Sequence, residues 1–372
     1  MKRSIALVAF LFALLACDAL ALPRFAARTG AKCQSCHVDP SGGAMRQAFG
    51  LQYGREKLPV PAWSSDFELE DFTNVITNFL GVGADFRTLY FYQEYPDSSI
   101  SNLNSFWQMQ GDLYLNFHLA KKVNVFLKKG LYSGFEAYGL LHILPAKGHI
   151  KVGKFIPNFG TKIDDHTAFI RTYTGFSPQF GRPELTGAEV GIAPGQFSVV
   201  GGLYNATDGF GGSGGNKKAV LGRAEGIFEL GEQVYLSAGG SIFAKEDNAG
   251  VKTTLYGGFG SFSYRNLTLS GEGDFIRTTQ GAALTGTTVT GIVCYLEGNF
   301  LITPGMDVKV AYDFYDPDKD LASGAYSRIS FGFEFFPIAG VEVRPLYRLT
   351  TKMQDPANVH SSELDLMLHF YL

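Results

Sequence analysis

The C-terminal stretch Leu364-Asp365-Leu366-Met367-Leu368-His369-Phe370-Tyr371-Leu372 alternates between two kinds of residue. One set of alternate positions is aliphatic or aromatic, whereas the other carries Asp365, His369 and Tyr371. Successive side chains of a strand point to opposite faces, so this stretch predicts a strand with one face toward lipid and one toward a polar interior. An apolar last strand containing Phe370 also suits assembly in an outer membrane.

The same period of two continues upstream to Phe79. Two further segments place charged residues on one face and apolar residues on the other, and their charged sets are Asp307, Lys309 and Asp313, and Glu342, Arg344 and Arg348. Most segments have close to the roughly 9 to 11 residues with which a tilted strand crosses a bilayer. A charged inner face on strand after strand predicts a wet or cofactor-lined lumen.

The connections between these segments alternate in length. Short turns are expected at 120–122, 194–195, 231–232, 265–266, 304–305 and 337–340, and longer polar loops near 93–105, 205–217, 245–251, 278–287, 315–324 and 352–361. We therefore predict an all-β fold, a transmembrane antiparallel barrel of about sixteen strands within residues 67–372. A soluble β-sandwich is the alternative, but its strands would be shorter and its outer faces polar.

The composition of the chain excludes several classes of protein. The chain of 372 residues has 45 glycines, 18% charged residues and a net charge of −3, and its basic residues are scattered. These values exclude disorder and give no basic stripe for nucleic acid. Beyond the first twenty residues there is no run of about 18 apolar residues, so a membrane location requires a barrel.

The N-terminus predicts export. Met1-Lys2-Arg3 is a cationic start, residues 4–16 form a short apolar core, and Ala19-Leu20-Ala21 offers a cleavage site, so residues 1–21 are predicted as a signal peptide. An alternative lipoprotein signal would make Cys17 a lipidated N-terminus. The expected location is the bacterial outer membrane.

Residues 22–66 carry the motif Cys33-Gln34-Ser35-Cys36-His37, which in an exported protein predicts attachment of one haem c. The two thiols can form thioethers to one edge of the porphyrin, and His37 can bind the iron as proximal ligand. A disulfide, a redox dithiol and a zinc site are the alternatives, and zinc would need a second ligand pair that the sequence lacks. So short a segment cannot bury a haem alone, so the barrel must shelter it.

Several residues could supply the sixth iron ligand. Met45 follows a glycine pair that lets the chain turn back over the ring, and a Met/His pair would raise the potential. His166 lies in a long segment near 158–185, the third outer loop, which in sixteen-stranded porins folds into the lumen. Met367 and His369 are weaker candidates. The other interpretation of this loop is a packed constriction in which Asp164, Asp165 and Arg171 form salt bridges.

The order of these features resembles the fused monohaem cytochrome-porins of bacterial outer membranes, a group that includes an iron-oxidase type. The specific match is Pro23 to His37, and the remainder matches as a porin-like pattern. Residues 38–46 look more like other fused cytochrome-porins than like the iron-oxidase branch. The resemblance implies electron transfer through haem c between a periplasmic c-type cytochrome or other carrier and an extracellular metal, such as iron, or another redox partner.

Three functions follow from these observations. The first is an outer-membrane electron conduit, in which Fe(II) oxidation is one possible activity. The second is a porin whose haem is a structural or sensory plug. The third is a peroxidase-like enzyme with an open distal position and His166 as its acid or base.

Overall fold

The computed structural model describes residues 24–64, 73–97, 99–131, 134–177, 183–207, 216–280, 286–354 and 357–372. The predicted signal peptide, with Cys17, lies outside these residues, and so does the predicted boundary near residue 66. The helices and strands are α2 (Arg24–Thr29), α3 (Cys33–Cys36), α4 (Ala48–Glu56), α5 (Pro61–Ser64), β1 (Leu80–Glu94), β2 (Leu103–Ala120), β3 (Val123–Gly130), β4 (Phe135–Leu144), β5 (Gly148–Phe155), α6 (Phe169–Thr172), β6 (Leu185–Ile192), β7 (Phe197–Asn205), β8 (Lys218–Gly231), β9 (Val234–Glu246), β10 (Lys252–Tyr264), β11 (Leu267–Thr279), β12 (Thr288–Thr303), β13 (Met306–Asp316), β14 (Tyr326–Phe335), β15 (Val341–Lys352) and β16 (Val359–Tyr371).

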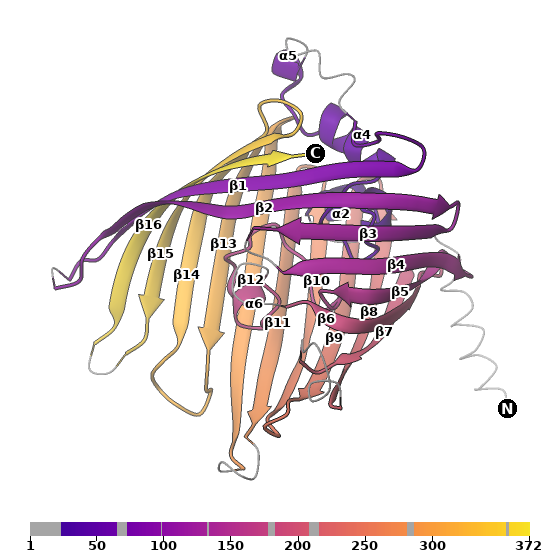
Figure 1. The fold of residues 1–372 in the computed structure, drawn as a ribbon. Helices are drawn as coiled ribbons and strands as arrows, with labels where there is room; N and C mark the ends of the chain where they lie inside the picture. The colour runs from indigo at the N-terminus through magenta and orange to yellow at the C-terminus, as the bar shows by residue number, and fades with distance from the viewer. Residues whose placement is uncertain are drawn as a thin grey trace, which may run out of the picture.

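The sixteen strands of the described residues form one closed antiparallel barrel (Figure 1). Each strand pairs with its neighbours in sequence, and β1 closes the barrel by pairing with β16. Closure leaves no unpaired strand edge, which a sheet in a bilayer requires because lipid cannot hydrogen-bond a free edge. The predicted barrel and its strand number are confirmed.

Side chains alternate across the barrel wall as the sequence predicts. In β16, Leu364 and Leu366 are 46% and 45% exposed, whereas Asp365 and His369 are each 2% exposed. All the inward residues predicted on β13 and β15 are also buried. The apolar outer belt fits a lipid bilayer and a closed barrel of this kind belongs in the bacterial outer membrane, which confirms the predicted location.

Short turns and long loops lie at opposite ends of the barrel. The turns predicted at 194–195, 231–232 and 304–305 each connect two strands, and the predicted long loops connect strands at the other end. In outer-membrane barrels the short turns face the periplasm. No helix in the described part of the chain is long and apolar enough to cross a membrane.

The N-terminal segment is attached at the end of the barrel where the short turns gather. Arg28 forms an ion pair of 2.6 Å with Asp307 of β13, and Lys32 Nζ donates to the carbonyl oxygen of Gly195 at 2.8 Å. The amide of Val60 donates to the carbonyl oxygen of Phe336 at 3.0 Å. Figure 1 shows α4 and α5 at this end, beside the C-terminus. The segment is therefore held to several strands that are far apart in the sequence.

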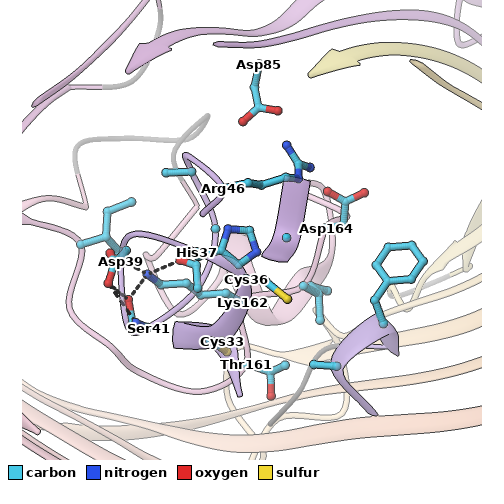
Figure 2. Close-up of a pocket in the computed structure, with 18 of the residues that line it drawn as sticks. Cys33, Cys36, His37, Asp39, Ser41, Arg46, Asp85, Thr161, Lys162 and Asp164 are labelled. Atoms are coloured by element: carbon cyan, nitrogen blue, oxygen red, sulfur yellow. Dashed lines mark hydrogen bonds and ion pairs between the residues drawn. The ribbon is translucent and has the colours of Figure 1, made fainter. Parts of the chain in front are cut away.

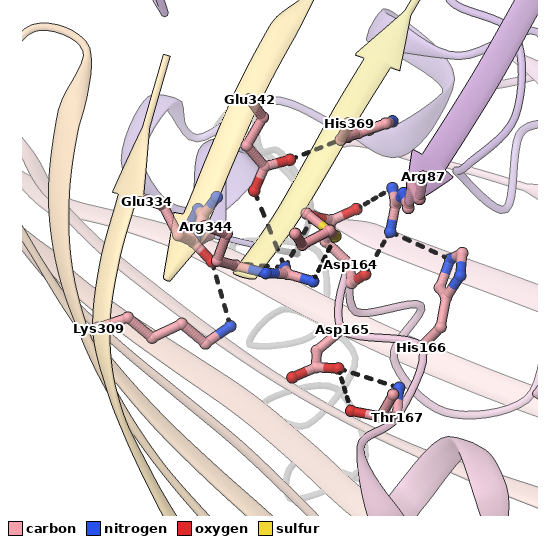
Figure 3. A network of polar contacts seen from close by, with 12 residues as sticks. Arg87, Asp164, Asp165, His166, Thr167, Lys309, Glu334, Glu342, Arg344 and His369 are labelled. Atoms are coloured by element: carbon pink, nitrogen blue, oxygen red, sulfur yellow. Dashed lines mark hydrogen bonds and ion pairs between the residues drawn. The ribbon is translucent and has the colours of Figure 1, made fainter. Parts of the chain in front are cut away.

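The third long loop, between β5 and β6, folds into the lumen as the sequence predicts. Asp164 forms ion pairs with Arg87 of β1 at 2.5 Å and Arg344 of β15 at 3.2 Å (Figure 3). Asp165 forms one with Arg348 at 3.0 Å. Strand arginines thus hold the loop across the lumen.

The prediction that Arg171 shares these salt bridges is wrong. Its guanidinium makes no ion pair with either aspartate, and it lines a cavity instead. The arginines of the wall, which project into the lumen from β1 and β15, already occupy both carboxylates.

Candidate functional site

A cavity of about 240 Å³ lies between the N-terminal segment and the third loop (Figure 2). The N-terminal segment contributes Cys33, Cys36 and His37 to its lining, and the loop contributes His166 and Arg171. The barrel wall completes the lining with side chains that include Tyr114 and Phe126. The cavity therefore brings together the motif and one of the proposed sixth ligands.

The two motif cysteines lie on the single helical turn α3. Neither sulfur is part of a disulfide, and burial raises the pKa of the Cys33 thiol to about 12. A Cβ atom built on Gly42 would lie 3.2 Å from Cys33 Sγ, and Gly42 has a φ of +87°. A glycine is required at this turn for its backbone conformation, and it also leaves room beside the thiol.

Close packing of two helices shapes the same region. A Cβ atom on Gly50 of α4 would lie 2.3 Å from the carbonyl oxygen of Cys36. Only glycine allows this close approach, so α4 packs directly against the backbone of the motif at Cys36. Sequence reasoning missed Gly50, because its spacing from the motif carries no pattern of its own.

His37 directly follows α3, has an extended backbone conformation and lines the cavity. Its Nδ1 atom is buried without a hydrogen-bond partner in the described structure. Burial, followed by the nearby Arg46, lowers its pKa to about 4, so the imidazole is neutral. A neutral imidazole beside two reduced thiols fits the donor set that haem c needs.

Met45 lies close to His37 in the chain but faces away from it. Residues 37 and 46 form an antiparallel bridge, and the amide of Val38 donates to the carbonyl oxygen of Met45 at 3.0 Å. Neighbouring positions of such a pair point to opposite faces, so Met45 is on the face away from His37. Its side chain packs against Gly81 and Gly83 of β1 and does not line the cavity.

The structure places the other candidate ligands differently. His166 lines the cavity, and its Nε2 lies 3.5 Å from the Arg87 guanidinium. His369 uses both ring nitrogens, each 2.9 Å from a carboxylate oxygen of Asp85 or Glu342. Met367 Sδ lies 3.2 Å from the Arg344 guanidinium and outside the cavity lining. Of the four candidates, the structure brings only His166 into the cavity with His37.

Asp39 anchors the loop that follows the motif. Its carboxylate lies 2.8 Å from Lys151 Nζ of β5 and 3.6 Å from Lys162 Nζ of the third loop. It also accepts a hydrogen bond of 2.7 Å from the Ser41 hydroxyl (Figure 2). These contacts tie the motif both to the wall and to the loop. Sequence reasoning missed them because Lys151 and Lys162 lie more than a hundred residues away.

No protein-family model matches this chain, and no protein of curated function matches its sequence. Solved structures of outer-membrane proteins are similar in fold. The anion-selective porin from Comamonas acidovorans has a TM-score of 0.57 and 12% identity, over 79% of this chain and 99% of that porin. Outer-membrane expressed OmpT of Vibrio cholerae has a TM-score of 0.57 and 10% identity, over 80% of this chain and 99% of that one. The outer membrane channel DcaP of Acinetobacter baumannii has a TM-score of 0.56 and 11% identity, over 79% and 97%.

At these identities the likeness shows the fold alone. The chain forms a closed sixteen-stranded barrel that is similar in fold to outer-membrane porins. What the N-terminal segment does inside this barrel has to be argued from its own residues.

Proposed function

We propose that this chain binds one covalent haem c inside the barrel and transfers electrons across the outer membrane. The observation that carries the proposal is the cavity, which collects Cys33, Cys36, His37 and His166 from two segments more than a hundred residues apart. Such a convergence is what a cofactor site held between a plug and a loop requires.

Each of these side chains has a role in this proposal. The thiols of Cys33 and Cys36 would form the two thioethers, and His37 would be the proximal iron ligand. His166 would be the sixth ligand, in preference to Met45, because it shares the cavity with His37. When bound, the haem supplies one-electron oxidation and reduction.

The surroundings would keep the group fixed and largely dry. Tyr114 and Phe126 line the cavity from β2 and β3, and both rings are 1% exposed. Asp39 forms a buried ion pair with Lys151 of β5, which ties the motif loop to the wall. Fixed ligands and restricted water lower the reorganisation that accompanies electron transfer.

The position of the cavity suggests the partners. The N-terminal segment lies at the end with the short turns, where a periplasmic c-type cytochrome or other electron carrier would dock. The far side of the third loop faces the long loops, where an extracellular metal such as iron, or another redox partner, would exchange electrons. The apolar belt would contact outer-membrane lipid.

The test is to produce the full chain in cells that mature c-type cytochromes and to purify it in detergent. Denaturing gels stained for haem should show a covalently labelled band, and the optical spectrum should be that of a low-spin cytochrome. In liposomes loaded with reduced methyl viologen, external ferric citrate should oxidise the internal dye at least tenfold faster than in empty liposomes.

The matched control is Cys36→Ala. This variant should form the barrel, assessed by its heat-dependent migration on gels, but should bind haem through at most one thioether and lose most of the electron transfer. Wild-type protein without covalent haem, or a Cys36→Ala variant with full electron transfer, would refute the proposal.

A second function is a porin with a haem that is structural or sensory. The porin fold with a loop inside the lumen favours it. Liposome swelling in sugars of increasing size distinguishes the two. Solute entry that is independent of the haem redox state, together with no transmembrane electron transfer, would support the porin.

A further inference from the structure

Cationic side chains outnumber carboxylates in the cavity wall, whose acidic residues are Asp39, Asp85, Glu136 and Asp164. Its lining includes seven lysines and arginines, namely Lys32, Arg46, Arg87, Lys128, Lys162, Arg171 and Arg223. Most of them contact an oxygen acceptor of the protein. Lys128, for example, lies 3.1 Å from a carboxylate oxygen of Glu136, and Arg223 lies 3.0 Å from one of Glu225. Arg46 stacks on the ring of Tyr371, at 4.2 Å from its centroid.

Within the described residues this stacking is the side-chain contact of Arg46, which likewise has no oxygen acceptor, whereas Arg171 has no stacking contact either. Arg171 lies in the last turn of α6, is 7% exposed, and makes no side-chain hydrogen bond or ion pair within the described residues. Its Nε atom is buried without a partner. Glu272 is the acidic residue that influences it, but that carboxylate already accepts a hydrogen bond of 2.8 Å from the Thr161 amide.

A buried guanidinium without an anion is costly, and burial lowers the pKa of Arg171 to about 10. Guanidinium groups bind carboxylates through two parallel hydrogen bonds, so a carboxylate is the chemistry that this position would take. No carboxylate of the described protein fills that role. The cavity therefore leaves the Arg171 guanidinium available to pair with the carboxylate of a bound molecule.

We propose that Arg171 binds a propionate carboxylate of the haem c held by Cys33, Cys36 and His37. This inference rests on the proposed function and adds to it. The thioethers would hold one edge of the macrocycle on the N-terminal segment, and the propionates project from another edge. Arg171 reaches the same cavity from the third loop, a separate element.

The pairing would give the third loop a direct effect on electron transfer. A fixed positive charge near a haem favours the reduced state, because reduction adds a negative charge. The loop that carries Arg171 is itself held by Asp165 and Arg348 at 3.0 Å. Arg171 would therefore set the midpoint potential as well as the position of the group.

The experiment compares three variants of the full-length, haem-loaded protein with the wild type. Arg171→Gln removes the charge, Arg171→Lys keeps it, and Arg277→Gln removes an exposed charge that is not part of the cavity. The measurements are haem content, midpoint potential by optical titration, and the propionate bands of the redox-difference infrared spectrum.

We expect Arg171→Gln to retain haem, to lower the midpoint potential and to shift the propionate bands. Arg171→Lys should restore most of the potential, and Arg277→Gln should match the wild type. An unchanged potential and unchanged infrared bands in Arg171→Gln, at normal haem content, would overturn the inference and leave the proposed function standing. Absence of haem from the wild type would instead refute the proposed function itself.

A diffusing carboxylate solute is the other source of the same chemistry. Planar bilayers with acetate or chloride as the anion separate the two. If Arg171→Gln changes the acetate-to-chloride selectivity while the midpoint potential stays at the wild-type value, Arg171 is a solute site and the inference is wrong.

Discussion

The barrel wall and the segments inside its lumen differ in the sequence separation of the residues that hold them together. In the wall, each strand bonds to its neighbours in sequence, and one alternation of side chains repeats around the barrel. In the lumen, the contacts join distant segments: Asp39 pairs with Lys151, and Asp165 with Arg348, 183 positions away. The structure of the wall therefore follows from a regular pattern in neighbouring residues, whereas the structure inside the lumen depends on individual contacts between distant residues.

This difference predicts different responses to mutation. A substitution in the wall should alter assembly of the whole barrel and leave the chemistry of the cavity alone. A substitution in the lumen should alter the cofactor or the loop and leave the barrel assembled. The following experiments test that separation.

The largest effect should come from Leu366→Arg in the wall. Leu366 faces outward near the middle of β16, so a cation there would be placed in the bilayer core at a cost of about 2–4 kcal/mol in folding free energy. Urea titration of folding in lipid vesicles, followed by gel migration, measures it.

Met353→Arg is the control, because Met353 lies just beyond the end of β15 on the side of the long loops. Near the interface the cost falls to about 0–1 kcal/mol. Equal destabilisation by the two substitutions would show that the outer belt is not where the structure places it.

The next effect concerns the lumen and the iron ligands. His166→Ala should convert the spectrum of the haem-loaded protein from low-spin to high-spin, because it removes the proposed sixth ligand. Met45→Leu should leave the spectrum low-spin, because Met45 packs against β1 and away from the cavity. Optical and electron paramagnetic resonance spectra provide the measurement, and the reverse result would favour Met45.

A smaller effect is expected from Asp165→Asn. It weakens the buried pair with Arg348 and the hydrogen bonds from Thr167, and we expect a loss of about 2 kcal/mol in the anchoring of the third loop. That loss makes opening of the loop roughly 30-fold more frequent, as measured by hydrogen exchange of peptides from the loop.

Asp320→Asn is the matched control, because this aspartate lies in an exposed outer loop. It should leave exchange in the third loop unchanged. In both variants the barrel should migrate as folded protein.

The smallest effect is expected from acid. Despite the burial that raises it, the pKa of Asp165 is held well below its usual range by Arg348, then by other cations. Its contribution to stability is therefore complete above the unfolded value of about 3.9 and is lost only as the pH falls through the lower folded value. Hydrogen exchange in the loop, corrected for its intrinsic rate, should be constant from pH 8 to 5. Loss of protection between pH 6 and 5 would contradict the pairing.

The sequence predicted most accurately those features that depend on residues close together in the chain. The alternation of Asp365, His369 and their outward neighbours predicted β16, and the turns and loops predicted the ends of the barrel. The entry of the third loop into the lumen was also predicted, although its ion-pair partners were not. The sequence around Asp164 and Asp165 does not indicate whether these residues form ion pairs with Arg171 or with the arginines of β1 and β15.

The sequence by itself determined the barrel, its orientation of faces, and the motif Cys33-Gln34-Ser35-Cys36-His37. Each of these depends on residues only a few positions apart, either the period of a strand or the spacing of one helical turn. The tertiary structure decided that His166 enters the cavity, that Met45 faces away, and that the Arg171 side chain has no hydrogen-bond or ion-pair partner among the residues that the structure describes. Such facts depend on which distant segments a closed barrel brings together, and no periodic pattern in the chain encodes them.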